Sequence, residues 1–133
     1  MTNEKNPKLY SPLVLAYIGD GVYDLFVRRE MVKRHPDMPA HKLHRETVKH
    51  VKAQAQSESM GHIEGLLTEE EEAVYKRGRN AKSATVPKNA DVSAYRRATG
   101  FEALMGYLYL AGRTDRLEFL MEQTLEAFPG ITG

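Results

Sequence analysis

Apolar residues recur at helical spacing along almost the whole chain, and no segment alternates apolar and polar residues as a strand would. Proline or glycine interrupts the pattern at 35–39, 61–65 and 112, which is typical of turns. We therefore expect helices over about 11–34, 39–59, 69–78, 91–111 and from 114 to just before 129. The pattern predicts an all-α fold, a compact domain of about five or six helices.

Length and composition limit the protein classes. The 133 residues, 41% of them apolar, fit one domain with its own core, so we expect a single domain over 1–133 with a flexible start at 1–10. The chain has no cysteine, which excludes disulfides, thiolate zinc sites and a cysteine nucleophile. No apolar run reaches the ~18 residues of a membrane span, and the first residues resemble no signal peptide. We expect a cytoplasmic protein with no membrane partner.

The first helix carries two unusual glycines. Ser11 and Pro12 predict its start, as N-cap and first helical residue. Gly19 and Gly21 then cost the helix roughly 1 kcal/mol each relative to alanine, so we expect another backbone to approach closely there. The apolar residues at helical spacing in this segment are Leu13, Val14, Tyr17, Ile18, Leu25, Met31 and Val32.

Charge is spread unevenly, although the formal net charge is only +1. Residues 76–97 contain seven basic residues and a single acidic one, Asp91. Most of this segment, 79–90, has no helical period and is expected to be a basic loop. A basic stripe on the second helix consists of Lys42, Arg45, Lys49 and Lys52. A solvated helix face and an exposed loop would explain these charges; so would a surface that binds phosphates.

Asp20 and Glu102 stand out as carboxylates in apolar helical surroundings. A buried carboxylate is costly unless it is paired or binds a cation. Each residue could lie at an exposed edge or pair with Arg96 or Arg97. Alternatively, the two converge on one divalent metal, for which oxygen ligands favour Mg²⁺ or Mn²⁺ over zinc.

Histidines and tyrosines have simpler readings. His41 and His44 are three residues apart on one helix, but no third ligand with matching spacing accompanies them, so surface or RNA-contacting roles are favoured over a zinc site. We expect the tyrosines at apolar helical positions to serve core or dimer packing. They are Tyr17, Tyr23, Tyr95, Tyr107 and Tyr109.

Several blocks, in order, resemble the ribonuclease III family. Residues 18–23, Ile-Gly-Asp-Gly-Val-Tyr, resemble the family's Leu-Gly-Asp-Ala-Val signature, and residues 101–110, Phe-Glu-Ala-Leu-Met-Gly-Tyr-Leu-Tyr-Leu, resemble its Glu-Ala-Leu-Ile-Gly block. The match is closer to the short bacterial branch, Mini-ribonuclease III, which lacks the double-stranded-RNA-binding domain. Further similar blocks are 68–74, 76–83 and 87–92, and the resemblance covers roughly residues 11–128.

The resemblance implies a ribonuclease III-type helical nuclease domain, a Mg²⁺-dependent homodimer that cuts double-stranded RNA, with Mn²⁺ as a substitute. It implies that Asp20 and Glu102 bind the metal and are catalytic. It also implies the large-subunit (23S) ribosomal RNA precursor as substrate and a large-subunit ribosomal protein as helper. We expect phosphate contacts from the basic loop and stripe, through Arg79, Lys82, Ser83, Lys88 and Lys49.

Two positions depart from the larger family. Its glutamate four residues before the signature aspartate is Ala16 here, and its aspartate three residues before the second glutamate is Thr99. Water or RNA oxygens would then complete the metal shell, because Mg²⁺ usually keeps several waters. The two losses leave open a catalytically inert RNA-binding protein on the same fold. A helical nucleotide hydrolase is less favoured, because the run from Glu69 to Glu72 matches a helix cap better than a carboxylate cluster.

Overall fold

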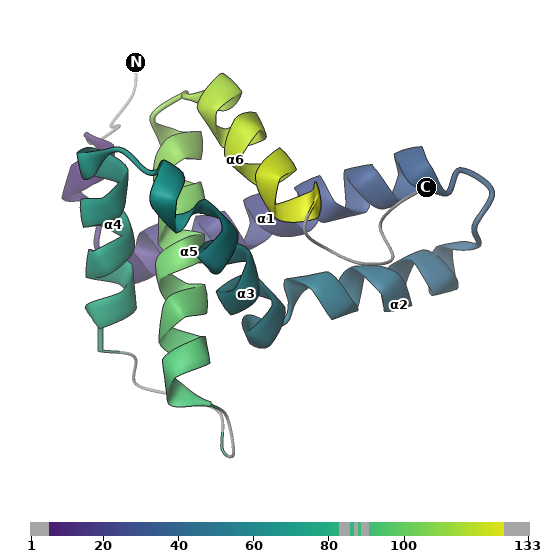
Figure 1. Cartoon of the computed structure of the whole chain (residues 1–133), viewed down its shortest axis with the longest axis horizontal. Helices are drawn as coiled ribbons and strands as arrows, with labels where there is room; N and C mark the ends of the chain where they lie inside the picture. The colour runs from purple at the N-terminus through teal and green to yellow at the C-terminus, as the bar shows by residue number, and fades with distance from the viewer. Residues whose placement is uncertain (1–5, 83–85, 87, 89–90, 127–133) are drawn as a thin grey trace.

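The computed structural model describes residues 6–82, 86, 88 and 91–126, and these contain helices and no strand (Figure 1). The predicted all-α fold of five or six helices is therefore confirmed. No helix in the described ranges is long and apolar enough to cross a membrane. The elements are η1 Pro7–Leu9, α1 Pro12–Arg34, α2 Ala40–Val51, α3 Ala53–Ile63, η2 Glu64–Leu66, α4 Glu69–Asn80, α5 Val92–Leu110 and α6 Thr114–Glu126.

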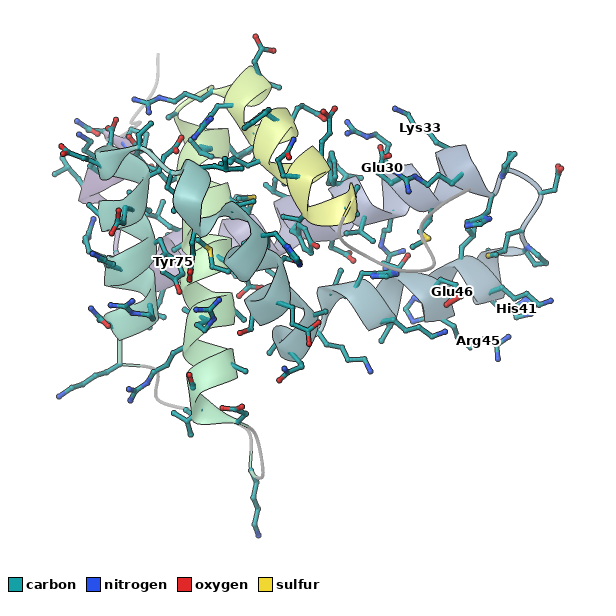
Figure 2. All side chains as sticks on the ribbon, in the orientation of Figure 1. Glu30, Lys33, His41, Arg45, Glu46 and Tyr75 are labelled. Atoms are coloured by element: carbon teal, nitrogen blue, oxygen red, sulfur yellow. The ribbon has the colours of Figure 1, made fainter. Side chains whose placement is uncertain are left out.

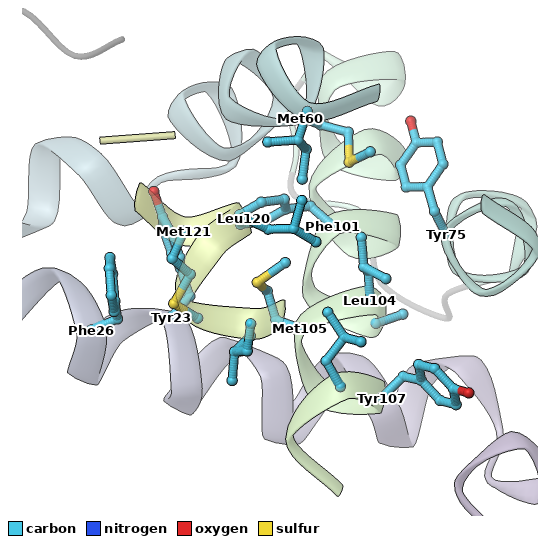
Figure 3. Packing of buried hydrophobic residues seen from close by; sticks show 14 of the residues in the cluster. Tyr23, Phe26, Met60, Tyr75, Phe101, Leu104, Met105, Tyr107, Leu120 and Met121 are labelled. Carbon is cyan, nitrogen blue, oxygen red and sulfur yellow. The ribbon is translucent and has the colours of Figure 1, made fainter. Parts of the chain in front are cut away.

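Helix α5 is the centre of the fold and packs against α1, α3, α4 and α6. In Figure 1 it runs vertically, α1 crosses it, and the second half of α1 extends with α2 to the right, away from α4. The core fills the space between α1, α5 and α6, where the buried rings of Tyr23 and Phe101 meet edge to face at 4.9 Å between centroids (Figure 3). Every residue of α5 from Ala103 to Leu108 is buried.

Glycines allow α1 and α5 to touch backbone to backbone. A Cβ built on Gly19 would lie 1.7 Å from the carbonyl oxygen of Glu102, and one built on Gly106 would lie 2.0 Å from the carbonyl oxygen of Leu15. No side chain fits at either position, because the obstacle is backbone. The close approach predicted from the sequence is therefore found at Gly19. It is absent at Gly21, where a Cβ would meet nothing within 4 Å.

A second glycine contact joins α4 to α5. A Cβ on Gly78 would lie 2.9 Å from the Cα of Gly100, and a Cβ on Gly100 would lie 2.7 Å from the Tyr75 ring and carbonyl oxygen. Helix α5 thus carries small residues on two sides, and each side accepts a neighbouring helix at close range.

The sequence predicted the first end of α4 correctly but not its second end. Thr68 and Glu71 form the predicted capping box, and the buried Glu71 carboxylate also accepts two hydrogen bonds from Arg116 of α6, each 2.8 Å. At the other end α4 continues to Asn80. Arg79 therefore lies in the last turn of a helix, and not in the loop predicted to begin at 79.

The first helix begins at the predicted residue. Ser11 caps α1 by accepting from the backbone N–H of Val14 at 3.2 Å, and Pro12 is the first helical residue. Within the predicted flexible start, Pro7–Leu9 form a 3₁₀ turn, and Arg77 donates to the carbonyl oxygen of Lys8 at 3.2 Å. Residues 1–5 lie outside the described residues.

The single helix predicted over 39–59 is wrong. Lys52 adopts an extended conformation, with φ −66° and ψ 155°, and separates α2 from α3. No proline or glycine marks this break, so the periodicity gave no warning of it. In α2, Thr47 is buried, whereas the neighbouring Val48 is 38% exposed.

The apolar stripe of α1 lies largely on the outside. Tyr17 is 83% and Leu25 69% exposed, whereas the buried face carries Leu15, Tyr23 and Val27. The spacing predicted the helix correctly, but the helix has apolar residues on two faces. Exposed large apolar side chains on the outer face are Leu13, Val14, Tyr17, Leu25 and Val32.

We predict opposite effects for alanine at the two glycines of α1. Gly19→Ala should lower the free energy of unfolding by about 3 kcal/mol, because a methyl group cannot fit against the Glu102 carbonyl. Gly21→Ala should raise it by up to about 1 kcal/mol, because alanine is the better helix former and the site is open. Urea unfolding of both variants measures the difference. Equal losses in the two variants would contradict the close contact at Gly19.

Candidate active site

The crossing of α1 and α5 brings Asp20 and Glu102 together. Asp20 follows Gly19, and Gly19 lies directly against the backbone of Glu102. The two side chains are within hydrogen-bonding reach of one another, with Asp20 exposed and Glu102 half-buried. The convergence expected from the sequence is therefore present. The residues are 82 positions apart in the chain, and the glycine contact is what joins them.

This pair of carboxyl groups lacks a compensating cation among the described side chains. Burial, together with the hydrogen bond and the negative charge of Asp20, raises the pKa of Glu102 to about 9. Arg97, one candidate partner from the sequence, is engaged elsewhere, because it binds Glu64 at 2.8 Å and the side chain of Ser57 at 3.0 Å. A divalent cation is the kind of group that would hold both carboxylates ionised.

Gln56 is a third polar residue at this site, and it was not predicted from the sequence. Its side chain is on α3, is 2% exposed, and hydrogen-bonds Glu102, which opposes the rise of the Glu102 pKa. Its amide nitrogen also donates to the carbonyl oxygen of Val51 at 3.1 Å. A glutamine in a polar stretch carries no distinguishing sequence signal, and only the fold of α3 onto α5 reveals its place.

The positions around the pair add no further carboxylate. Ala16 is buried in the core, and the Thr99 hydroxyl donates to the carbonyl oxygen of Tyr95 at 3.0 Å. Asp24 accepts from Arg28 at 3.0 Å. In the parts of the chain that the structure describes, no three His, Cys, Asp or Glu side chains gather into a metal site, and this includes His41 and His44.

The donor set nevertheless fits a hard divalent cation. Two neighbouring carboxyl groups that repel one another when ionised offer oxygen ligands without sulfur or imidazole, which suits Mg²⁺ or Mn²⁺. Mg²⁺ tolerates so few protein ligands because it retains water.

Basic residues flank one side of this site. Lys82 and Arg96 line a pocket of about 280 Å³ together with Thr99, which is one helical turn before Glu102. Arg96 lines a second hollow with Arg79. Arg96 belongs to the basic segment 76–97 and was a candidate partner for a carboxylate, and the structure places it beside Lys82.

The other residues predicted to bind phosphate, where the structure describes them, are not among those that line the pocket with Lys82. Arg79 lies over the Tyr75 ring, 5.6 Å from its centroid, and donates to Asn80 at 3.2 Å. Lys88 is exposed. Ser83 lies outside the described residues.

The basic stripe of α2 forms a separate surface. Lys42, Arg45 and Lys49 line one shallow hollow of about 410 Å³, and Arg45 and His41 project away from the body of the molecule (Figure 2). Lys49 forms an ion pair with Glu46 at 2.7 Å, so its charge is partly compensated. Lys52 stands at the break between α2 and α3 and ends the stripe.

The chain is similar to known proteins in both sequence and structure. Residues 13–113 match the ribonuclease III domain model. A Mini-ribonuclease 3 from Thermoanaerobacter sp. (strain X514) is 55% identical over 87% of this chain and 81% of the relative, and one from Clostridium tetani is 48% identical over 91% and 80%. A crystal structure of a Fusobacterium nucleatum protein, 28% identical, superposes with a TM-score of 0.81 over 92% of this chain and 98% of that one.

Because the pKa of Glu102 is raised, we predict that Glu102→Gln increases the free energy of unfolding in a pH-dependent way when no divalent metal is present. The folded wild type keeps a proton on Glu102 up to about pH 9, whereas the unfolded chain releases it near pH 4.5, so wild-type stability falls as the pH rises between these values. The neutral glutamine is free of this loss. We expect Glu102→Gln to match wild type near pH 4 and to exceed it by about 1–3 kcal/mol at pH 8.

Denaturant unfolding in EDTA at several pH values measures this gain. Glu72→Gln is the matched control, because that exposed glutamate pairs with Lys76 at 2.7 Å and its pKa is lowered. A pH-independent difference between Glu102→Gln and wild type would show that the carboxyl is not held protonated.

Proposed function

The chain belongs to the ribonuclease III family, and from this membership we propose that it is a metal-dependent endoribonuclease that cleaves double-stranded RNA. Endoribonuclease activity follows from the family. The observation that carries the finer proposal is the pairing of Asp20 and Glu102, two carboxyl groups placed side by side at a helix crossing without a basic partner between them. An inert RNA-binding protein would gain nothing from retaining this repulsion.

Asp20 and Glu102 would hold the metal, with Mg²⁺ as the expected ion and Mn²⁺ as a substitute. When bound, a divalent metal lowers the pKa of a water and neutralises charge on a phosphate. The chain itself contributes two aimed carboxylates, one exposed and one half-buried, and a fixed distance between them set by the α1–α5 contact. No side chain is assigned as a general base.

Duplex RNA would lie along the basic side of the site. Arg79, Lys82 and Lys88, named from the sequence, and Arg96, named from the pocket it shares with Lys82, are the candidates for phosphate contacts. Ser83 and Lys49 remain predicted contacts. An A-form duplex offers phosphates and 2′-hydroxyls across a shallow minor groove, which suits recognition by shape.

We propose that two copies associate through the outer face of α1. The exposed Leu13, Val14, Tyr17 and Leu25 share this face, and Leu25 also lines an apolar pocket of about 310 Å³ with Tyr109 of α5. An apolar surface of this kind usually marks an interface. A two-fold dimer would supply one active site for each RNA strand, which supports a double-strand cut.

We also propose a specific RNA substrate, a helper protein and a compartment. Likeness to Mini-ribonuclease 3 supports the large-subunit (23S) ribosomal RNA precursor as the RNA, with a large-subunit ribosomal protein as helper and the cytoplasm as the compartment. These roles come from the resemblance alone.

The first test of this function is loss of cleavage without loss of binding. Asp20→Asn and Glu102→Gln should each reduce cleavage of a long RNA duplex at least 10³-fold with Mg²⁺ present, because each keeps its shape and loses the charge that holds the ion. Gel analysis of cleavage and a gel-shift assay on the same preparations measure the two properties. Asp24→Asn, one turn along α1, is the matched control and should retain activity. Wild-type cleavage by either site variant would remove that residue from the metal site.

The basic surface can be tested by salt dependence in the Asp20→Asn background, where RNA stays intact. Replacing Arg79, Lys82 and Lys88 with alanine should weaken binding of every duplex sequence and lower the log–log salt slope by roughly two to three units, taking about 0.9 per phosphate contact from duplex DNA as a guide. The comparison variant replaces Lys42, Arg45 and Lys49. A slope that falls only in this second variant would move the RNA surface to α2.

The dimer is tested by placing charge on the exposed ring of α1. Wild type should sediment with twice the chain mass at micromolar concentration, and Tyr17→Arg should sediment as a monomer because the charge cannot be buried between two copies. Val92→Arg, at an exposed valine on α5, should stay dimeric. A monomeric wild type that still cuts both strands would refute the dimer.

A further inference from the structure

Gln56 occupies an unusual position for an uncharged polar residue. Its side chain is 2% exposed and lies on the first turn of α3, directly after the break at Lys52. A buried amide is costly unless its hydrogen-bonding groups find partners. The Gln56 amide has two hydrogen-bond partners: the carbonyl oxygen of Val51, at 3.1 Å, and the carboxyl group of Glu102.

The two contacts connect different parts of the fold. Val51 is the last residue of α2, and Glu102 is on α5. An amide NH₂ group carries two hydrogens, so one nitrogen can donate to both acceptors at once. Capping the end of α2 would require only the first contact. The second contact reaches the carboxylate that faces Asp20.

We propose that Gln56 is a positioning residue of the metal site, which fixes the orientation of the Glu102 carboxylate toward Asp20 and ties it to the end of α2. This inference rests on the proposed metal-dependent function. It explains how a site with alanine at 16 and threonine at 99 keeps a defined geometry with only two carboxylates. The hydrogen bond from Gln56 orients the Glu102 carboxylate, which additional metal ligands would otherwise help to do.

The consequence is measurable without RNA or cleavage. Loss of an outer hydrogen-bond partner typically weakens metal binding 10- to 100-fold. Gln56→Met removes the donor and keeps the length of the side chain, so it should raise the Kd for Mn²⁺ about 10-fold or more. Gln54→Met, an exposed glutamine two residues earlier on the same helix, is the matched control and should bind Mn²⁺ as wild type does.

The experiment titrates Mn²⁺ into RNA-free protein and follows free Mn²⁺ by electron paramagnetic resonance, with circular dichroism as a check of folding. Wild type, both methionine variants and Asp20→Asn are compared. A cap with no role at the metal would lower the melting temperature of Gln56→Met and leave its Kd unchanged, and that result overturns the inference. If Gln56→Met does not fold, Gln56→Asn retains a buried amide that is one methylene too short, and the same rise in Kd is expected.

The controls separate the two levels of the argument. Binding by wild type and its loss in Asp20→Asn, together with an unchanged Gln56→Met, overturns only the role of Gln56. No Mn²⁺ binding by wild type overturns the metal site and the inference with it.

Discussion

The backbone contact between α1 and α5 is the constraint on which the rest of the structure depends. With no Cβ at Gly19, the carbonyl of Glu102 approaches α1 more closely than any side chain would allow. The next residue on one helix is Asp20, and the residue contacted on the other is Glu102. Gly19 destabilises the helix by roughly 1 kcal/mol relative to alanine. The close contact that it allows sets the separation of the two carboxyl groups. Gly106 and Leu15 repeat the contact one turn away, which fixes the crossing against rotation.

The electrostatics of the site follow from that contact. Burial disfavours ionisation of Glu102 and the Asp20 carboxyl beside it adds repulsion, so Glu102 keeps its proton to about pH 9. Elsewhere the fold pairs its buried and half-buried acids with donors. The buried Glu71 meets Arg116, and the half-buried Glu70 meets Lys8, Tyr107 and Arg113, which lowers the pKa of Glu70 to about 2. The contrast within one small domain supports the proposal that a cation from outside the chain binds between Asp20 and Glu102.

Helical period and cap residues predicted most of the fold, because they act locally. Ser11, the helix cap at Thr68 and the turns at 35–39 and 112 lie where the sequence placed them, whereas α3 continues through Gly61 to Ile63, beyond the end predicted at 59. The break at Lys52 was missed because no proline or glycine marks it. The exposed stripe of α1 could not be assigned from one chain, since an apolar face turned toward a second copy has the same period as one turned toward the core. Asp20 and Glu102 were found because charged residues among apolar ones are conspicuous, whereas Gln56 is ordinary until α3 folds against α5.

Helix α5 explains how so short a chain serves several roles. Its first half presents Arg96 and Thr99 to the pocket shared with Lys82, its middle carries Glu102, and its end presents Tyr109 beside the exposed face of α1. Small residues on two of its sides let α1 and α4 approach, so the carboxyl pair, the basic pocket and the outer apolar face are positioned by one rigid element. A substitution that shifts α5 must disturb all three together. A substitution at Tyr17 or Lys82, by contrast, changes a surface and leaves the carboxylate pair in place, because neither side chain takes part in the crossing.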